Sequence, residues 1–101
     1  MLEAAREAHM AVEKLSPDAF VDDWLRRRAL ERTLEVLGEA AGKVSEEFRA
    51  AHPDIDWRGR IGQRNVLAHE YGRINHRLLF EAANRRLPPL IRRLQELLER
   101  I

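Results

Sequence analysis

The strongest constraint on the fold is a stripe of apolar residues that recurs every three or four positions through the middle of the chain. Its members are Leu30, Leu34, Leu37, Ala41, Val44 and Phe48, and it extends back through Phe20 and Trp24. Because an α-helix turns once in about 3.6 residues, such a stripe lies on one face of a helix and must pack on other helices. No segment alternates apolar and polar residues for long enough to form a strand. The sequence therefore predicts an all-α fold, an antiparallel bundle of four to five helices in one domain spanning residues 1–101.

Proline, glycine and capping residues predict where the helices begin and end. A first helix runs from about Leu2 to Leu15. Ser16 and Pro17, an N-cap and a first-turn proline, open a long second helix that carries the stripe. The expected later elements are a loop from Ala51 to Asp56, a third helix from Asp56 or Trp57 to about Tyr71 and Gly72, a fourth from about Asn75 to Arg86, and a fifth that opens at Pro88 and Pro89.

Two groups of residues in these helices have expected packing roles. The small residues Gly38, Ala40, Ala41 and Gly42 thin one part of the stripe, so a neighbouring helix or a second subunit can approach closely there. Trp24 and Trp57 are expected to anchor the core, because aromatic side chains bury large areas.

Composition excludes several classes of function. The chain has no cysteine, which excludes disulfides, thiolate metal sites and thiol catalysis. No apolar run is long enough to cross a membrane, and the first residues lack the order of a signal peptide. We expect a soluble, cytoplasmic protein. The net charge of +1 conceals a basic region between Trp57 and Arg77, where five arginines face a single acidic residue, Glu70.

That basic region contains the octapeptide RNVLAHEY, residues 64–71. At about 100° per residue, the positions of Arg64 and His69 diverge by roughly 140° around a continuous helix. They meet over one small substrate only if the helix breaks near His69 or if two chains build the site together. A homodimer with its two-fold axis beside this helix would bring two arginines and two histidines together.

Such a cluster has the groups needed to cleave RNA without a metal or another cofactor. One histidine can take the proton of a ribose 2′-hydroxyl while another protonates the leaving 5′-oxygen. Arginines would bind the scissile phosphate, and Tyr71 could bind the phosphate or stack on a base. The alternative is a solvated helix end, since an arginine five residues before a histidine arises easily by chance in so arginine-rich a chain.

A longer pattern resembles the HepT-like branch of the HEPN superfamily. Its blocks are Phe20-Val21-Asp22, the segment LEVLGEAA at 34–41, Phe48-Arg49, HPDIDW at 52–57, IGQRN at 61–65 and AHEY at 68–71. The resemblance implies a dimerising helical bundle in which Arg64 and His69 are the catalytic pair, Asn65 is the polar residue after the arginine, and Tyr71 is a modification site. It further implies a ribonuclease toxin of a toxin–antitoxin pair, whose partner, an MNT-type nucleotidyltransferase, silences it by adding AMP to Tyr71.

Two other interpretations stay open. In the first, the chain is a noncatalytic module that binds a nucleotidyltransferase partner or a nucleotide. In the second, it is a plain helical dimerisation domain. His9, His52 and His76 are expected to be surface or capping residues. Arg32 and Glu39, seven positions apart, line the same groove as the motif, form a structural ion pair or face solvent.

Overall fold

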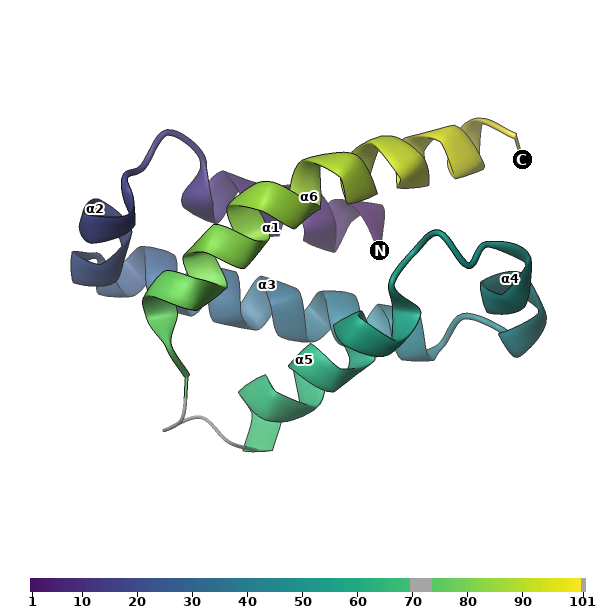
Figure 1. Ribbon diagram of the computed structural model, residues 1–101, viewed down its shortest axis with the longest axis horizontal. Helices are drawn as coiled ribbons and strands as arrows, with labels where there is room; N and C mark the ends of the chain where they lie inside the picture. Colours follow the sequence, from purple (N-terminus) through teal and green to yellow (C-terminus); the bar gives the residue numbers. More distant parts are fainter. Residues whose placement is uncertain (70–73, 101) are drawn as a thin grey trace.

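The computed structural model describes residues 1–69 and 74–100, and it folds them into six α-helices (Figure 1). These are α1 (Leu2–Val12), α2 (Pro17–Asp22), α3 (Trp24–Gly42), α4 (Glu46–Ala51), α5 (Trp57–His69) and α6 (His76–Glu99). The described part of the chain contains no strand, so the predicted all-α class is confirmed.

Helix α3 is the centre of the bundle. It packs against α1 and α5, and α6 packs against α1 and α2; Figure 1 shows α3 running between α5 and the pair of α1 and α6. Leu30, Leu34, Leu37 and Ala41 are all buried, which confirms the central part of the predicted stripe. Phe20 of α2 meets Phe80 of α6 with ring centroids 5.1 Å apart and closes the core at that end.

The predicted long second helix is wrong in one respect, because the chain divides it into α2, α3 and α4. Ser16 caps α2 as predicted, since its hydroxyl accepts the Ala19 N–H at 3.1 Å. Asp23 is then extended and caps α3 by accepting the Arg26 N–H. Ser45 caps α4 in the same way through the Phe48 N–H. A capping side chain offers the first free N–H groups of a helix a partner, so each of these residues starts a new helix.

These breaks explain two further departures from the predicted core. The extended Asp23 changes the register between Phe20 and Trp24, and Trp24 is 61% exposed instead of anchoring the core. The break at Ser45 likewise turns Phe48 outward, and its ring stacks on His52 at 4.4 Å. Trp57 is buried as predicted, and its indole N–H donates to the His52 carbonyl at 2.9 Å.

The two ends of the chain also depart from the predicted boundaries. The first helix stops at Val12 rather than near Leu15, and Lys14 adopts a left-handed φ of 65° in the turn that follows. The predicted fourth and fifth helices are one helix, α6, which continues through Pro88 and Pro89. Each proline removes one backbone N–H donor. Leu87 and Leu90 are buried on either side of the prolines, and their packing holds the helix together. The chain thus has six described helices instead of the expected four to five.

Candidate functional site

The start of α5 is fixed by Ile55 and Asp56 of the preceding loop and by Trp57, the first residue of the helix. Asp56 accepts the Gly59 N–H at 3.0 Å, which caps the helix, and Ile55 and Trp57 are buried. The predicted loop before this helix is confirmed, because α4 ends at Ala51 and α5 begins at Trp57. Arg64 and Asn65 lie two turns further along the same rigid element.

A close approach between α3 and α5 sets the position of Arg64. Gly38 is buried, and a Cβ atom built on it would collide with the Cβ of Arg64 and lie 2.6 Å from the Arg60 carbonyl oxygen. The predicted close approach at the thin part of the stripe is therefore confirmed, with α5 as the neighbouring helix. Position 42 does not require a glycine, since the nearest atom to a Cβ built on Gly42 would be the Ile61 Cγ1 at 4.0 Å.

Glu39, the residue after Gly38, faces the guanidinium of Arg64. One carboxylate oxygen of Glu39 lies 3.8 Å from the Arg64 Nη2, and the Arg64 Nη1 donates to the Asn65 side-chain carbonyl at 3.2 Å. The Arg64 Nε is buried without an acceptor among the described residues. Both side chains are about one-third exposed, so the pair is accessible. Arg32 pairs with Glu35 at 3.3 Å instead. Glu39 therefore lies in the predicted groove, whereas the predicted ion pair between Arg32 and Glu39 is wrong.

A pocket of about 280 Å³ opens over this pair. Its lining residues are Gly38, Glu39, Gly42, Lys43, Ile61, Arg64 and Asn65. Lys43 and Arg64 give it two cations against one carboxylate. An arginine fork beside a lysine suits a phosphate group, because charged donors make the stronger hydrogen bonds to phosphate oxygens.

The remaining motif residues fall at the edge of what the structure describes. His69 is the last residue of α5, and its side chain is outside the described atoms. Tyr71, with the predicted helix end at Tyr71 and Gly72, lies outside the described residues. Because α5 is continuous from Arg64 to His69, the roughly 140° between these two positions holds in the folded chain.

The arginines of the basic region do not form one cluster. Arg77 is paired with Asp18 of α2, and the hydrogen bond that it donates to the Asp18 carboxylate raises the pKa of Arg77. Arg60 faces α6, and Arg73 is outside the described residues. The local excess of charge in the sequence is thus spread over different faces, and Arg64 is the described arginine of this region that faces Glu39.

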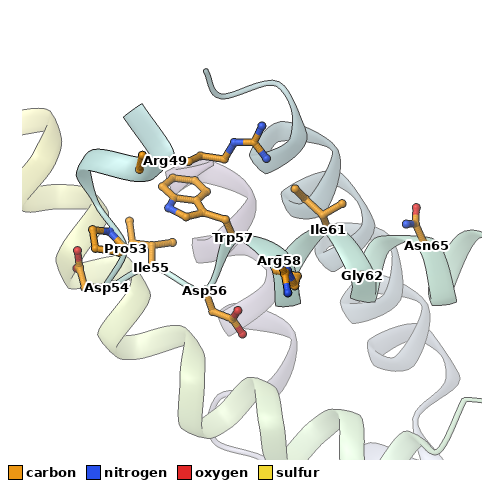
Figure 2. Close-up of a pocket in the computed structure, with 11 residues that line it drawn as sticks. Arg49, Pro53, Asp54, Ile55, Asp56, Trp57, Arg58, Ile61, Gly62 and Asn65 are labelled. Carbon is orange, nitrogen blue, oxygen red and sulfur yellow. The ribbon is translucent and has the colours of Figure 1, made fainter. Parts of the chain in front are cut away.

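A cavity of about 790 Å³ adjoins this pocket along α5 and shares Ile61 and Asn65 with it (Figure 2). Ile55, Trp57 and Ile61 contribute apolar surface to it. Its charged residues balance, with Arg49 and Arg58 against Asp54 and Asp56. Figure 2 shows Asp56 pointing from the start of α5 toward α6. A cavity with balanced charge gives a polyanion little attraction.

The remaining histidines take structural positions. His9 lies 3.8 Å from Glu13, His52 stacks on Phe48, and His76 lies 3.5 Å from the buried carboxylate of Glu31. Sequence reasoning missed Glu31, which also pairs with Arg28 at 3.0 Å. The available signal was its place beside Leu30 and three residues before Leu34, on the buried face of the helix.

The described ranges hold neither a metal-binding cluster nor a helix that could span a membrane. Residues 1–69 and 74–100 contain no group of three histidine or carboxylate side chains placed to hold a metal ion. Within the same ranges, no helix has the length and apolar character to cross a membrane.

Comparisons with known proteins place the chain among relatives of one kind. A family model described as "Ribonuclease HepT-like" matches residues 1–97. The chain is 35% identical over 89 residues to "Putative RNase TTE0752" of Caldanaerobacter subterraneus subsp. tengcongensis, a match that covers 88% of this chain and 80% of that protein. It is 30% identical over 93 residues to "Probable ribonuclease HepT" of Thermococcus cleftensis, with 88% and 84% covered. No solved structure matches the chain.

Proposed function

The chain belongs to the HepT-like ribonuclease family, and on that premise we propose that it is a metal-independent endoribonuclease that uses Arg64 and His69. The observation that carries the proposal is the placement of Arg64. Its Cβ lies against Gly38, its guanidinium lies beside Glu39 and Asn65, and it precedes the last residue of α5 by five positions. The family and its named relatives support ribonuclease activity in general, and the roles of individual residues are our proposal.

The proposed reaction needs a base, an acid and an anion site. A histidine removes the proton of a ribose 2′-hydroxyl, and the freed oxygen attacks the adjacent phosphorus while the bond from phosphorus to the 5′-oxygen breaks. A second histidine gives its proton to that 5′-oxygen. Arg64 binds the phosphate and stabilises the charge that grows on its oxygens, as preorganised donors do in other phosphate chemistry. The products are a 2′,3′-cyclic phosphate and a free 5′-hydroxyl.

The geometry of α5 supports a site shared by two chains. Since α5 is unbroken between Arg64 and His69, one protomer turns the two positions away from each other. A two-fold axis beside α5 supplies the second arginine and the second histidine from the partner copy. We therefore propose a homodimer as the active species.

The proposed cellular role is that of a toxin in a toxin–antitoxin pair. Its antitoxin would be an MNT-type nucleotidyltransferase that adds AMP to Tyr71, two residues after His69. An AMP group on Tyr71 would add bulk and negative charge, and like charge repels the RNA backbone. Modification of Tyr71 would thus block the substrate without unfolding the chain.

Substrate chemistry tests the proposed reaction directly. A labelled single-stranded RNA is incubated with the protein in EDTA, beside a matched strand in which a single ribose at the cleaved position is replaced by deoxyribose. Cleavage of the first strand, with a cyclic phosphate end and no cut at the deoxyribose, is the expected result. Cleavage at the deoxyribose would contradict attack by the 2′-hydroxyl. Binding of RNA or AMP without any cleavage would favour the noncatalytic module.

A further inference from the structure

A second basic site lies between α5 and α6, away from the pocket of Arg64. It is a cavity of about 410 Å³, which we call the arginine pocket. Its lining residues are Arg60, Arg85, Arg86 and Arg93, the acidic Asp54 and Asp56, and the apolar Ile55, Pro89 and Leu90. Four arginines face two aspartates, so the arginine pocket carries an excess of positive charge that the larger cavity in Figure 2 lacks.

Both aspartates of the arginine pocket already have partners. Asp54 accepts a hydrogen bond from the Arg93 Nε at 2.7 Å. Asp56 accepts the Gly59 N–H as the cap of α5. Arg60, Arg85 and Arg86, by contrast, make no hydrogen bond or ion pair with any residue in the described ranges. The charges of Arg85 and Arg86 are therefore available to a ligand, while the charge of Asp56 acts on Arg60.

Arg60 and Arg86 face the same space. Both line the arginine pocket and the smaller cavity of about 30 Å³ beside it. Burial lowers the pKa of Arg60, Asp56 opposes that shift, and the nearby charge of Arg86 lowers the pKa further. Two like charges at a partly buried position raise the free energy of the empty site, and an anion between them would lower it.

From the arginine pocket a row of cavities, which we call the groove, follows α5 toward the catalytic motif. The small cavity shares Arg60 and Arg86 with the arginine pocket, and it shares Gln63 and Ala82 with a third cavity of about 290 Å³. That third cavity is largely apolar and reaches Val66 and Leu67 in the last turns of α5. Helix α5 makes its main packing contacts with α3, and these three cavities lie where its other side meets α6.

The span from the arginine pocket to His69 suits a short piece of nucleic acid. Arg60 precedes His69 by nine residues, or about 13 Å of helix at 1.5 Å per residue. This length corresponds to about four stacked nucleotides at 3.4 Å each. The cations at one end can bind a phosphate of the strand, and the apolar side chains at the other end can contact the bases of its next nucleotides. A free nucleotide would occupy only part of this groove.

We propose that the groove between α5 and α6 binds the RNA strand beside the cleavage site, with a phosphate of that strand on Arg60 and Arg86 in the arginine pocket. The inference rests on the proposed function, since it places a second phosphate of the same substrate. It adds to that function a contact that holds the RNA away from the bond that breaks. The contact is to the backbone, so it raises affinity without selecting a sequence.

The test compares Arg86→Ala with Arg92→Ala. Both arginines are exposed on α6, and Arg92 does not line the arginine pocket. Binding of a labelled single-stranded RNA is measured by fluorescence anisotropy at several salt concentrations, with His69→Ala as the background so that the RNA stays intact. Arg86→Ala should weaken binding about three- to tenfold and reduce the slope of log affinity against log salt by about 0.7, the value for one phosphate of a single strand. Arg92→Ala should leave both quantities unchanged. Arg85→Ala, a second exposed residue of the pocket, should act in the same direction as Arg86→Ala.

Each outcome separates this inference from the proposed function. If the two variants bind RNA equally well with the same salt slope, the arginine pocket does not bind the strand, even where the chain cleaves RNA. If the wild type fails to cleave RNA but its binding depends on Arg86 and not on Arg92, the groove assignment stands and the proposed reaction falls. A third outcome is that binding of AMP or inorganic phosphate depends on Arg86 but binding of RNA does not. That result would overturn the RNA assignment in favour of a small phosphorylated ligand.

Discussion

Gly38 of α3 and Arg64 of α5 lie so close together that no side chain fits at position 38. The next residue along α3, Glu39, faces the guanidinium of the same arginine. Two consecutive residues of one helix therefore fix both the backbone and the charged end of the proposed phosphate-binding residue. Stability and activity should both respond to changes at this contact, although in different proportions.

Gly38→Ala should separate α3 from α5. The new Cβ would meet the Cβ of Arg64 and the Arg60 carbonyl oxygen, and overpacking of this kind costs about 1–3 kcal/mol of unfolding free energy. RNA cleavage should fall with it, because Arg64 moves. Gly42→Ala is the matched control, since the nearest atom is at 4.0 Å, and it should gain up to about 1 kcal/mol from helix propensity. Urea unfolding measures both variants, and equal stabilities would contradict the close approach.

Glu39→Gln should lower the rate of RNA cleavage without unfolding the chain. The carboxylate orients Arg64 at 3.8 Å, and both side chains are about one-third exposed. Exposed pairs contribute at most about 1 kcal/mol, so the expected loss in kcat/KM is about two- to fivefold. Glu35→Gln, which removes the partner of Arg32 one turn earlier on α3, is the control and should leave the rate unchanged. Identical rates for the two variants would remove Glu39 from the site.

The hydrogen bond between Asp54 and Arg93 should make stability depend on pH. The bond from Arg93 lowers the pKa of Asp54 below its ordinary value of 3.8. As the pH falls, Asp54 is therefore protonated in the unfolded chain before it is protonated in the folded one. The pair stabilises the fold fully above the ordinary pKa of Asp54, and this stabilisation is lost as the pH falls through the lowered pKa of the folded state. Asp54→Asn should be less stable than the wild type above about pH 5, and the difference should shrink below the ordinary value. A difference that persisted undiminished in strong acid would contradict the pair.

Tyr71→Phe should separate RNA cleavage from its inhibition by AMP addition. The proposed reaction uses Arg64 and His69, so the variant should still cleave RNA. It lacks the hydroxyl that would receive AMP, so incubation with ATP and an MNT-type nucleotidyltransferase should leave its mass and its activity unchanged. The wild type, treated alike, should gain the mass of AMP units and lose activity. A variant that is silenced as fully as the wild type would place the modification at another residue.

The helical period was enough to predict the class and the centre of the fold. Leu30, Leu34 and Leu37 repeat with the period of a helix and are all buried, because one face of α3 packs on both α1 and α5. The cap at Ser16 and the start of α5 at Trp57 are local features, and the sequence predicted them correctly for that reason.

Interruptions of the helices could not be read from the period alone. Asp23 and Ser45 cap new helices, although the apolar stripe runs past both residues. Pro88 and Pro89 have the opposite effect, since the packing of Leu87 and Leu90 carries α6 through two residues that usually end a helix. In both cases a contact made in three dimensions overrides the local signal.

The site shows the same division between local and tertiary information. Arg64 and Asn65 could be singled out from their place in a motif, and Gly38 from its place in a thin stripe. The arginine pocket could not, because Arg60 and Arg86 are 26 positions apart and meet only through the placement of α6 beside α5.

The measurement that tests the central claim most directly is the rate of RNA cleavage in EDTA by the wild type and by His69→Ala, with the mass of each protein confirming that Tyr71 is unmodified. General acid–base catalysis contributes about 10²–10⁴ to a rate, so His69→Ala should be slower by at least about 100-fold while it keeps the circular dichroism and oligomeric state of the wild type. Equal rates for the two proteins, or complete loss of wild-type cleavage in EDTA, would contradict a metal-independent site built on Arg64 and His69.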